Sequence, residues 1–366
     1  MKKIKKSIGG FTASFVLCIA LLILFLYDPQ ASSAQLFRGL ELCSESLVPS
    51  LFPYMVISEM LVRSGSLSFV APVLSKLSDR LFGVSGSGAA AMLLGTVCGF
   101  PVGAKVAAEL YEKELITKDE AERLTGFCSL PSAPFLIFAV GEKLFGSRRI
   151  GILLYSEAVA AAIICGIASA RGKRRSPTTR EDGSKVAPPL PDIFTESVSS
   201  AAVSVIKICA YVAFFSAAVG GISSLAAGFS PALQVSLLSF FELTSAAAAC
   251  SSLTDRGLGL VIVSAAAGWS GLSVLCQIRS VTRTSRGSIS LKPYLLMKVF
   301  SAFFCALMTS VSIAVCPFII PPLPPASDTA ILPPVYPMVF GTAANLFFLV
   351  SCLIYLCKEL DRRRKI

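Results

Sequence analysis

Apolar segments as long as a bilayer is thick recur along this 366-residue chain, and they restrict its fold more than any other feature. A helix needs about 20 apolar residues to cross the hydrocarbon core of a membrane. Charged residues make up only 15% of the chain, whereas soluble domains contain about 25%. The apolar runs are continuous, unlike the weakly alternating strands of a membrane β-barrel. The sequence therefore predicts an all-α polytopic membrane protein in contact with the lipid bilayer.

The basic residues lie in short segments between these runs. A net charge of +11 could indicate a nucleic-acid partner, but Lys and Arg in short loops are typical of the cytoplasmic side of a membrane protein. We therefore expect no nucleic-acid partner, and both termini inside. The runs predict eight spans, at 11–27, 38–62, 125–141, 150–170, 194–228, 258–276, 294–320 and 335–357.

Two further apolar runs are broken in the middle. Run 86–111 contains Gly-Phe-Pro-Val-Gly-Ala-Lys at 99–105, and run 232–253 is interrupted by a glutamate at 242. Proline removes a backbone donor and clashes with the preceding turn, and glycine weakens a helix. Backbone freed at membrane depth is tolerated only where it is buried in protein or lines a cavity. Each run therefore predicts a re-entrant helical hairpin, the first from the inside and the second from the outside.

The spans that follow the hairpins are also broken, at 131–134 and 269–271. Each half of the chain then contains a span, a hairpin, a broken span and a span, and the two halves begin on opposite sides. This layout predicts inverted repeats with a binding site near the midplane, as in many secondary transporters. The expected domains are an N-terminal helix with an external loop (1–37), the first repeat (38–170), a basic cytoplasmic linker (171–193), the second repeat (194–320), and a Pro-rich external loop with the last helix and a basic cytoplasmic tail (321–366).

Enzyme chemistry finds little support in the residues. The chain contains no histidine, so a Ser-His-Asp or Cys-His catalytic unit is excluded. Its twelve cysteines include no CxxC pair and indicate neither a zinc site nor a disulfide framework. The sequence contains no Gly-rich phosphate-binding loop, so we do not expect ATP hydrolysis. We therefore expect no enzymatic activity, no cofactor and no metal.

The candidate substrate site consists of polar, charged and helix-breaking residues at the breaks. Lys105 is ionisable within a membrane segment, which indicates function, unless its side chain snorkels to the interface. It could offset one charge of an organic anion while the broken helix offers backbone N–H groups. Glu242 either couples transport to an ion or forms a structural ion pair. The remaining candidates could bind substrate or satisfy freed backbone groups; they are Gly99, Pro101, Gly103, Ser132, Thr244, Ser270, Ser273 and Gln277.

Several of these segments together resemble a known family. They are Gly99–Lys105, Phe127-Cys128 leading to Pro134-Phe135, Glu242-Leu243-Thr244, and Gly271–Val274 with Gln277. Over roughly residues 35–320 the chain resembles the sporulation integral membrane proteins of the YlbJ (SpoVV) type, within the nucleoside-recognition (Gate) superfamily. That superfamily is related to concentrative nucleoside transporters, so the resemblance implies a fold like theirs, with a re-entrant helical hairpin in each inverted repeat. This resemblance implies a role in endospore formation. The protein would lie in the outer forespore membrane, which derives from the mother cell, and would move dipicolinic acid towards the forespore.

Three functions agree with the sequence. The first is a transporter of a small organic anion, with dipicolinate as the substrate that the resemblance implies. The alternatives are a nucleoside or ion transporter of the same superfamily, and a non-transporting membrane scaffold for sporulation. Charged residues in broken membrane helices favour transport, because a scaffold has no need of them. A coupling ion and a homo-oligomer are both compatible with the sequence, which specifies neither.

Overall fold

The computed structural model describes residues 2–170 and 188–315, and these residues are almost entirely helical. The first half contains α1 (Lys2–Tyr27), α2 (Pro29–Leu42), the π-helix η1 (Cys43–Leu47), α3 (Val48–Arg63), α4 (Leu67–Phe82), α5 (Gly86–Cys98), α6 (Val102–Glu112), α7 (Lys118–Phe127), the π-helix η2 (Phe135–Leu144) and α8 (Arg148–Ala170). The second half contains α9 (Leu190–Leu225), α10 (Pro231–Phe241), α11 (Leu243–Ser251), α12 (Arg256–Trp269), α13 (Gly271–Val281), the short strands β1 (Arg283–Thr284) and β2 (Gly287–Ser288), and α14 (Lys292–Val315).

Several helices begin where a short polar side chain caps them. The side chain of Asp28 accepts a hydrogen bond from the backbone N–H of Ala31 at 2.9 Å, and Pro29 occupies the first position of α2. Both features start a helix. Residues 29–37, expected as an external loop, are therefore the first turns of α2, and that expectation was wrong. Thr117 caps α7 in the same way, accepting from the N–H of Glu120 at 3.2 Å.

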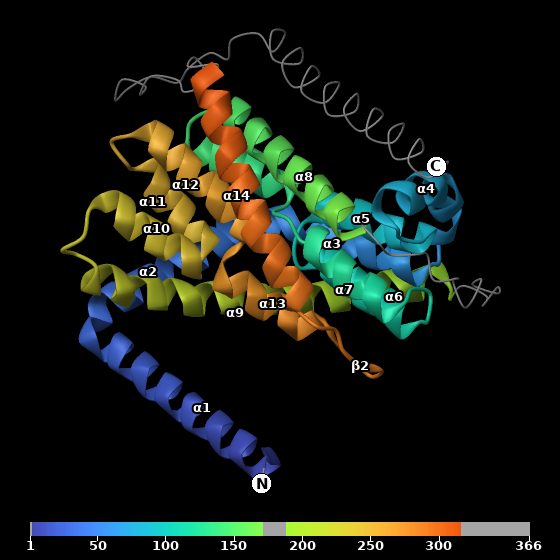
Figure 1. Ribbon diagram of the computed structural model, residues 1–366, viewed down its shortest axis with the longest axis horizontal. Coiled ribbons are helices and arrows are strands. Elements are labelled where there is room, and N and C mark those ends of the chain that lie inside the picture. Colours follow the sequence, from blue (N-terminus) through green and yellow to red (C-terminus); the bar gives the residue numbers. More distant parts are fainter. Residues whose placement is uncertain (1, 171–187, 316–366) are drawn as a thin grey trace.

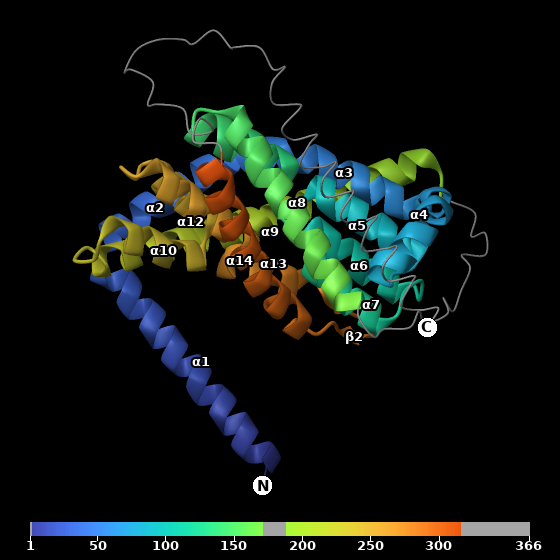
Figure 2. The ribbon, with the colours of Figure 1, turned by 45° about the horizontal axis from the view of Figure 1, so that its top comes forward.

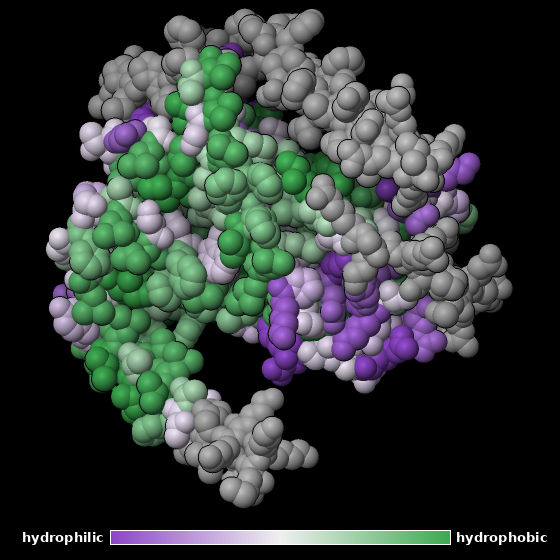
Figure 3. Space-filling view, viewed as in Figure 1, coloured by the Kyte–Doolittle hydropathy of each residue, from purple (hydrophilic) through white to green (hydrophobic). Residues whose placement is uncertain are grey.

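The apolar helices are long enough to cross a membrane. Within the described residues, α8, α9, α12 with α13, and α14 each have the necessary length and hydropathy. The number rises to six if two bent pairs are each one span, namely α1–α2, bent by 97°, and α4–α5, bent by 87°. Apolar side chains cover most of the face in Figure 3, and polar ones gather at one end, near α7 and α13. These findings confirm an all-α, multi-pass membrane protein. The expected span at 335–357, most of the basic linker and the C-terminal tail lie outside the described residues.

Both hairpins are present as pairs of packed helices. The first, α5 with α6, turns at residues 99–101, and the second, α10 with α11, turns at Glu242. The two broken spans are α7 with η2, and α12 with α13. The second arm of each hairpin contacts the second part of the other half's broken span, so that α6 touches α13 and α11 touches η2. This reciprocal contact is what two repeats of one layout produce when they face each other.

The two hairpins lie on opposite sides of the molecule. In Figures 1 and 2, α10, α11 and α12 lie on one side, α4 to α7 lie on the other, and α14 crosses between them. The long helix α9 packs along both α2 and α3 and so runs past both hairpins. Helix α1 projects from this body and contacts α2 and α9. The arrangement brings the broken segments together at the centre.

Candidate functional site

The four breaks meet at a narrow cavity of about 30 Å³. The N–H of Phe100, in the first break, donates to the carbonyl of Leu130, in the second, at 2.9 Å. The third and fourth breaks also touch, because a Cβ on Gly271 would lie 3.1 Å from the carbonyl oxygen of Phe241. Residues of the first three breaks line the cavity, together with α13, which follows the fourth break, and the helices beside them: Leu47, Leu51, Phe100, Ser132, Phe135, Ile208, Val212, Glu242, Leu243, Thr244, Val274 and Gln277.

Close backbone packing explains the glycines of the first break. Gly99 ends α5 with φ = 74°, a conformation that L side chains rarely adopt, and a Cβ there would lie 2.4 Å from the backbone nitrogen of Ser132. A Cβ on Gly103 would lie 2.5 Å from the carbonyl oxygen of Cys128. Of this group, Pro101 lines the large pocket described below, whereas Ser132 lines the narrow cavity. The two glycines thus shape the site by letting α5 and α6 approach the second break.

Glu242 begins α11 as its N-terminal cap. Its carboxylate accepts hydrogen bonds from the N–H groups of Thr244 at 2.9 Å and Ser245 at 2.5 Å, and from the hydroxyl of Thr244 at 2.6 Å. The positive end of the helix dipole stabilises the same charge. Within the described residues, Glu242 forms no ion pair with a lysine. Glu242 and Thr244 both line the narrow cavity, and the hydroxyl of Thr244 donates to the carboxylate of Glu242, so the two side chains are held together.

Three polar side chains lie at or just after the fourth break, and one of them, Gln277, lies where the narrow cavity meets the large pocket. Ser270 has φ = 75° and is buried, and its hydroxyl donates to the carbonyl of Ala267 at 3.3 Å, so it satisfies backbone freed by the break. Ser273 is also buried and accepts from Nε2 of Gln277 at 3.4 Å. The other amide atom of Gln277, Oε1, is buried and has no hydrogen-bond partner within the described part of the chain. Gln277 lines both the narrow cavity and the large pocket.

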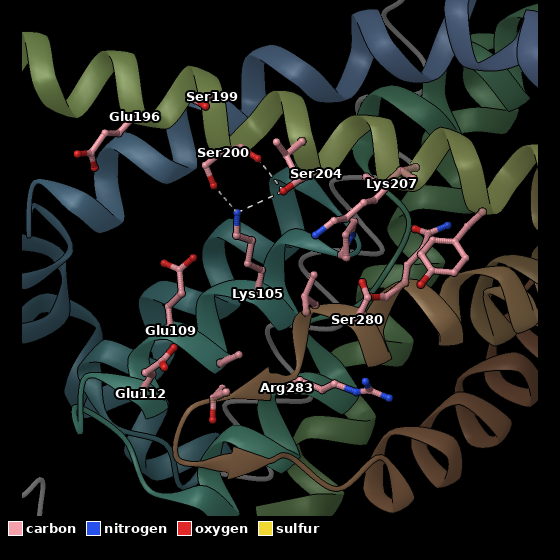
Figure 4. A pocket seen from close by; sticks show the side chains of 18 of the residues that line it. Lys105, Glu109, Glu112, Glu196, Ser199, Ser200, Ser204, Lys207, Ser280 and Arg283 are labelled. Atoms are coloured by element: carbon pink, nitrogen blue, oxygen red, sulfur yellow. Dashed lines mark hydrogen bonds between the residues drawn. The ribbon is translucent and has the colours of Figure 1, made fainter.

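The large pocket has a volume of about 570 Å³ and lies between α6, α9 and α13 (Figure 4). Charged side chains of both signs line it. The cations are Arg63, Lys105, Lys207 and Arg283, and the acids are Glu109, Glu112 and Glu196. The pocket shares Ile208 and Gln277 with the narrow cavity, so the two spaces adjoin.

Lys105 points across the large pocket from α6 towards α9 (Figure 4). Its ammonium group donates to the hydroxyls of Ser200 at 2.9 Å and Ser204 at 3.3 Å, and it pairs with the carboxylate of Glu59 on α3. Only 18% of the Lys105 side chain is exposed. Lys105 is therefore held inside the protein by three acceptors.

Further charges extend this ion pair towards the rim of the pocket. Arg63 donates to Glu59 through Nε at 3.4 Å and to Glu196 through Nη1 at 2.5 Å. On the opposite side of the rim, Glu112 accepts from the hydroxyl and the N–H of Ser285, and these hydrogen bonds hold the pKa of that carboxyl below its usual value. Glu112 therefore stays ionised and tied to the β1–β2 turn.

Two cations of the pocket remain without a recorded ion pair in the described structure. Lys207 and Arg283 are exposed, and both line the pocket. Sequence analysis did not select Glu196, Ser200 or Ser204 of α9 as site residues. The signal was available, because Glu196, Ser200, Ser204 and Lys207 recur three or four residues apart and so form a polar stripe on one face of an apolar helix.

Fold and site together define a class: a polytopic α-helical membrane protein whose paired broken helices surround a central cavity. The chain is similar to the sporulation integral membrane protein YlbJ of Bacillus subtilis (strain 168), with 28% identity over 337 residues and 81% of each chain covered. This similarity supports the YlbJ family to which the motifs pointed. No family model and no solved structure matches the chain, and the wider Gate superfamily stays a prediction.

Proposed function

We propose that this protein is a membrane transporter of a small organic anion, that its substrate is dipicolinate, and that it acts during sporulation in the outer forespore membrane. One observation carries the proposal: the large, cation-bearing pocket adjoins, through Gln277, the cavity at which the four helix breaks meet. A binding site between inverted repeats and formed by discontinuous helices is characteristic of secondary transporters. No chemical step is part of the proposed cycle.

The chemistry of the large pocket supports an anionic substrate. Its volume of about 570 Å³ falls within the range of about 300–1,000 Å³ that small-molecule sites occupy. Lys207 and Arg283 can each bind a carboxylate without giving up an ion pair seen in the structure, and Lys105 lines the same pocket. A planar dicarboxylate offers two such groups. The relative's description as a sporulation protein supports dipicolinate over other dicarboxylates.

The narrow cavity supports a gated cycle. Its volume of about 30 Å³ is far below the range of about 300–1,000 Å³ that small-molecule sites occupy, so a dicarboxylate cannot occupy it without movement of the surrounding segments. The tips of both hairpins line it. In the described conformation a substrate would therefore fit the large pocket but could not pass the narrow cavity at the breaks. One state of an alternating-access cycle has this form.

The alternatives differ in what the pocket must recognise. A nucleoside is uncharged on its base and sugar, so its transport would not depend strongly on Lys105, Lys207 or Arg283. A scaffold would tolerate filling of the large pocket altogether. An ion transporter would respond to the pocket charges but would not transport dipicolinate. These differences make the substrate directly testable.

The experiment compares spores with and without the gene, in a strain that contains no redundant transporter. We expect dipicolinate in the spores to fall to near background in its absence and to recover when the wild-type gene is returned. The same protein, purified into proteoliposomes, should take up labelled dipicolinate and not labelled uridine. Normal spore dipicolinate without the gene would contradict the proposal, and uptake of uridine instead would favour the nucleoside transporter.

A further inference from the structure

A second pocket, of about 290 Å³, lies beside α2 and α11. Its walls include Gln35 and Arg38 of α2, Val219 of α9, and Ser245 and Ser252 at the second hairpin and its end. It shares no lining residue with the large pocket. Helix α9 lines both pockets, so positions along this helix show where the second pocket lies relative to the large pocket.

Helix α9 passes three spaces in order. Its residues between Glu196 and Tyr211 line the large pocket, Ile208 and Val212 line the narrow cavity, and Val219 lines the second pocket. At about 1.5 Å per residue, Glu196 and Val219 are about 35 Å apart along the helix, which is comparable to the bilayer core of about 30 Å. The two pockets therefore lie towards opposite ends of a membrane-crossing helix, with the narrow cavity between them.

The opposite wall gives the same order independently. Along α2, η1 and α3, Arg38 lines the second pocket, Leu47 and Leu51 line the narrow cavity, and Arg63 lines the large pocket. Helices α2 and α3 both pack against α9, so these residues face the corresponding levels of that helix. Two separate segments of the chain thus place the three spaces on one line.

Each pocket also lies against the second arm of one hairpin. Helix α6 begins beside Phe100 at the narrow cavity and lines the large pocket with Pro101, Lys105 and Glu109. Helix α11 begins at Glu242, also at the narrow cavity, and lines the second pocket through Ser245. The two pockets are therefore equivalent positions in the two repeats.

The second pocket carries the chemistry of an anion site. Arg38 is exposed, and no ion pair or hydrogen bond of its side chain is recorded in the described structure. None of the described lining residues is acidic, and Gln35, Ser245 and Ser252 add polar groups. We infer that this pocket is the outer vestibule of the transport path, and that Arg38 binds the same organic anion there which Lys105 meets in the large pocket. This inference rests on the proposed anion transport.

The first test measures access to each pocket. Ser252→Cys and, as its counterpart in the large pocket, Ser280→Cys are placed separately on a background whose native cysteines are replaced and which still takes up dipicolinate. We expect a membrane-impermeant thiol reagent to label Ser252→Cys from the outside and Ser280→Cys from the inside. We also expect dipicolinate to slow the labelling at both positions. Labelling of Ser252→Cys only from the inside, or without any protection by dipicolinate, would overturn the inference.

The second test measures how removing the charge of Arg38 changes the binding of dipicolinate in the second pocket. Arg38→Gln should raise the dipicolinate concentration needed to protect Ser252→Cys about tenfold or more, as the loss of a charge-assisted hydrogen bond predicts. It should leave the protection of Ser280→Cys unchanged. Lys76→Gln, at an exposed lysine of α4 that lines none of the three spaces, is the matched control. If the wild-type protein takes up no dipicolinate, the proposed function has failed; if it takes up dipicolinate but dipicolinate does not protect Ser252→Cys, only the outer vestibule has failed.

Discussion

Lys105, which lines the large pocket, forms an ion pair with Glu59, and this pair joins α6 to α3. The two side chains are only 18% and 6% exposed. An ammonium group has three donors, and Glu59, Ser200 and Ser204 accept from all three. A substrate carboxylate can therefore reach Lys105 only by replacing one of these partners. Glu59 is the anionic partner, and Arg63 remains to hold it once it is displaced.

Replacing Lys105 with Met should reduce dipicolinate uptake about tenfold or more, because a charge-assisted hydrogen bond of about 1.5–3 kcal/mol is lost. The protein should still insert into the membrane, since methionine keeps the apolar stem and Arg63 still pairs with Glu59. Lys105→Arg should restore uptake only in part, because the planar guanidinium has a different geometry. Uptake into proteoliposomes, normalised to protein level, is the measurement.

The matched control for this change is Lys118→Met, at an exposed lysine at the start of α7 that lines none of the three spaces. It should leave uptake unaltered. An equal loss of uptake in both variants would show that Lys105 is structural. A lower level of Lys105→Met protein with normal uptake per molecule would show the same.

Replacing Glu59 with Gln should have the opposite effect on affinity. The change removes the internal carboxylate that competes with substrate for Lys105. We expect the KM for dipicolinate to fall about fivefold, the factor that corresponds to about 1 kcal/mol of ion pairing. Glu45→Gln, which removes an exposed carboxylate paired with Lys143 at 2.5 Å, is the control and should leave KM unchanged. A higher KM in Glu59→Gln would mean that the pair organises the site and does not compete with substrate.

Replacing Gln277 with Leu should separate stability from transport. Its buried Oε1 has no partner within the described residues, so its removal is favourable, whereas the loss of the long Nε2 hydrogen bond to Ser273 at 3.4 Å is unfavourable. Because the two effects oppose each other, the melting temperature in detergent should change little. Uptake should nevertheless fall several-fold, because Gln277 lies where the large pocket meets the narrow cavity. Unchanged uptake would show that substrate does not pass this junction.

Replacing Gly103 with Ala should destabilise the protein by about 1–3 kcal/mol, as overpacking of a close contact does. The new methyl group would lie 2.5 Å from the carbonyl oxygen of Cys128 and 2.8 Å from the Cα of Gly95, both of which are backbone atoms. Thermal unfolding in detergent measures the change. Gly228→Ala is the control, since a Cβ there meets nothing within 4 Å. Equal melting temperatures of the two variants would show that α5, α6 and the second break do not need this close approach.

Sequence reasoning located the breaks because their causes are local. Proline, glycine and a charge within an apolar run each act on the backbone next to them, so the turns at 99–101 and at Glu242 could be predicted without knowledge of the fold. The same reasoning failed at 29–37, where low charge suggested a loop but the Asp28 cap and Pro29 start a helix. The Asp28 cap and Pro29 were visible in the sequence, and such local helix signals predict the structure of this segment better than its low charge does.

The partners of the site residues could not be predicted in this way. Glu59 lies 46 positions before Lys105, and from the sequence alone it reads as a residue near the end of a span. Lys298 reads as a lysine of an unbroken helix, but it is buried and its Nζ donates to the carbonyl of Ser129, which the second break leaves free. Such pairings depend on how helices from both halves pack, and no local pattern encodes that packing.

Helix α9 is 36 residues long, which corresponds to about 54 Å. Even at a tilt of about 40°, the upper end of the usual range, it would span about 41 Å, whereas the hydrocarbon core is about 30 Å thick. Part of α9 must therefore stand in the aqueous phase at one or both ends. Its first turns carry Asp192 and Glu196, and Glu196 forms the rim of the large pocket. A solute that entered the pocket at this rim would therefore come directly from water, without first crossing the lipid.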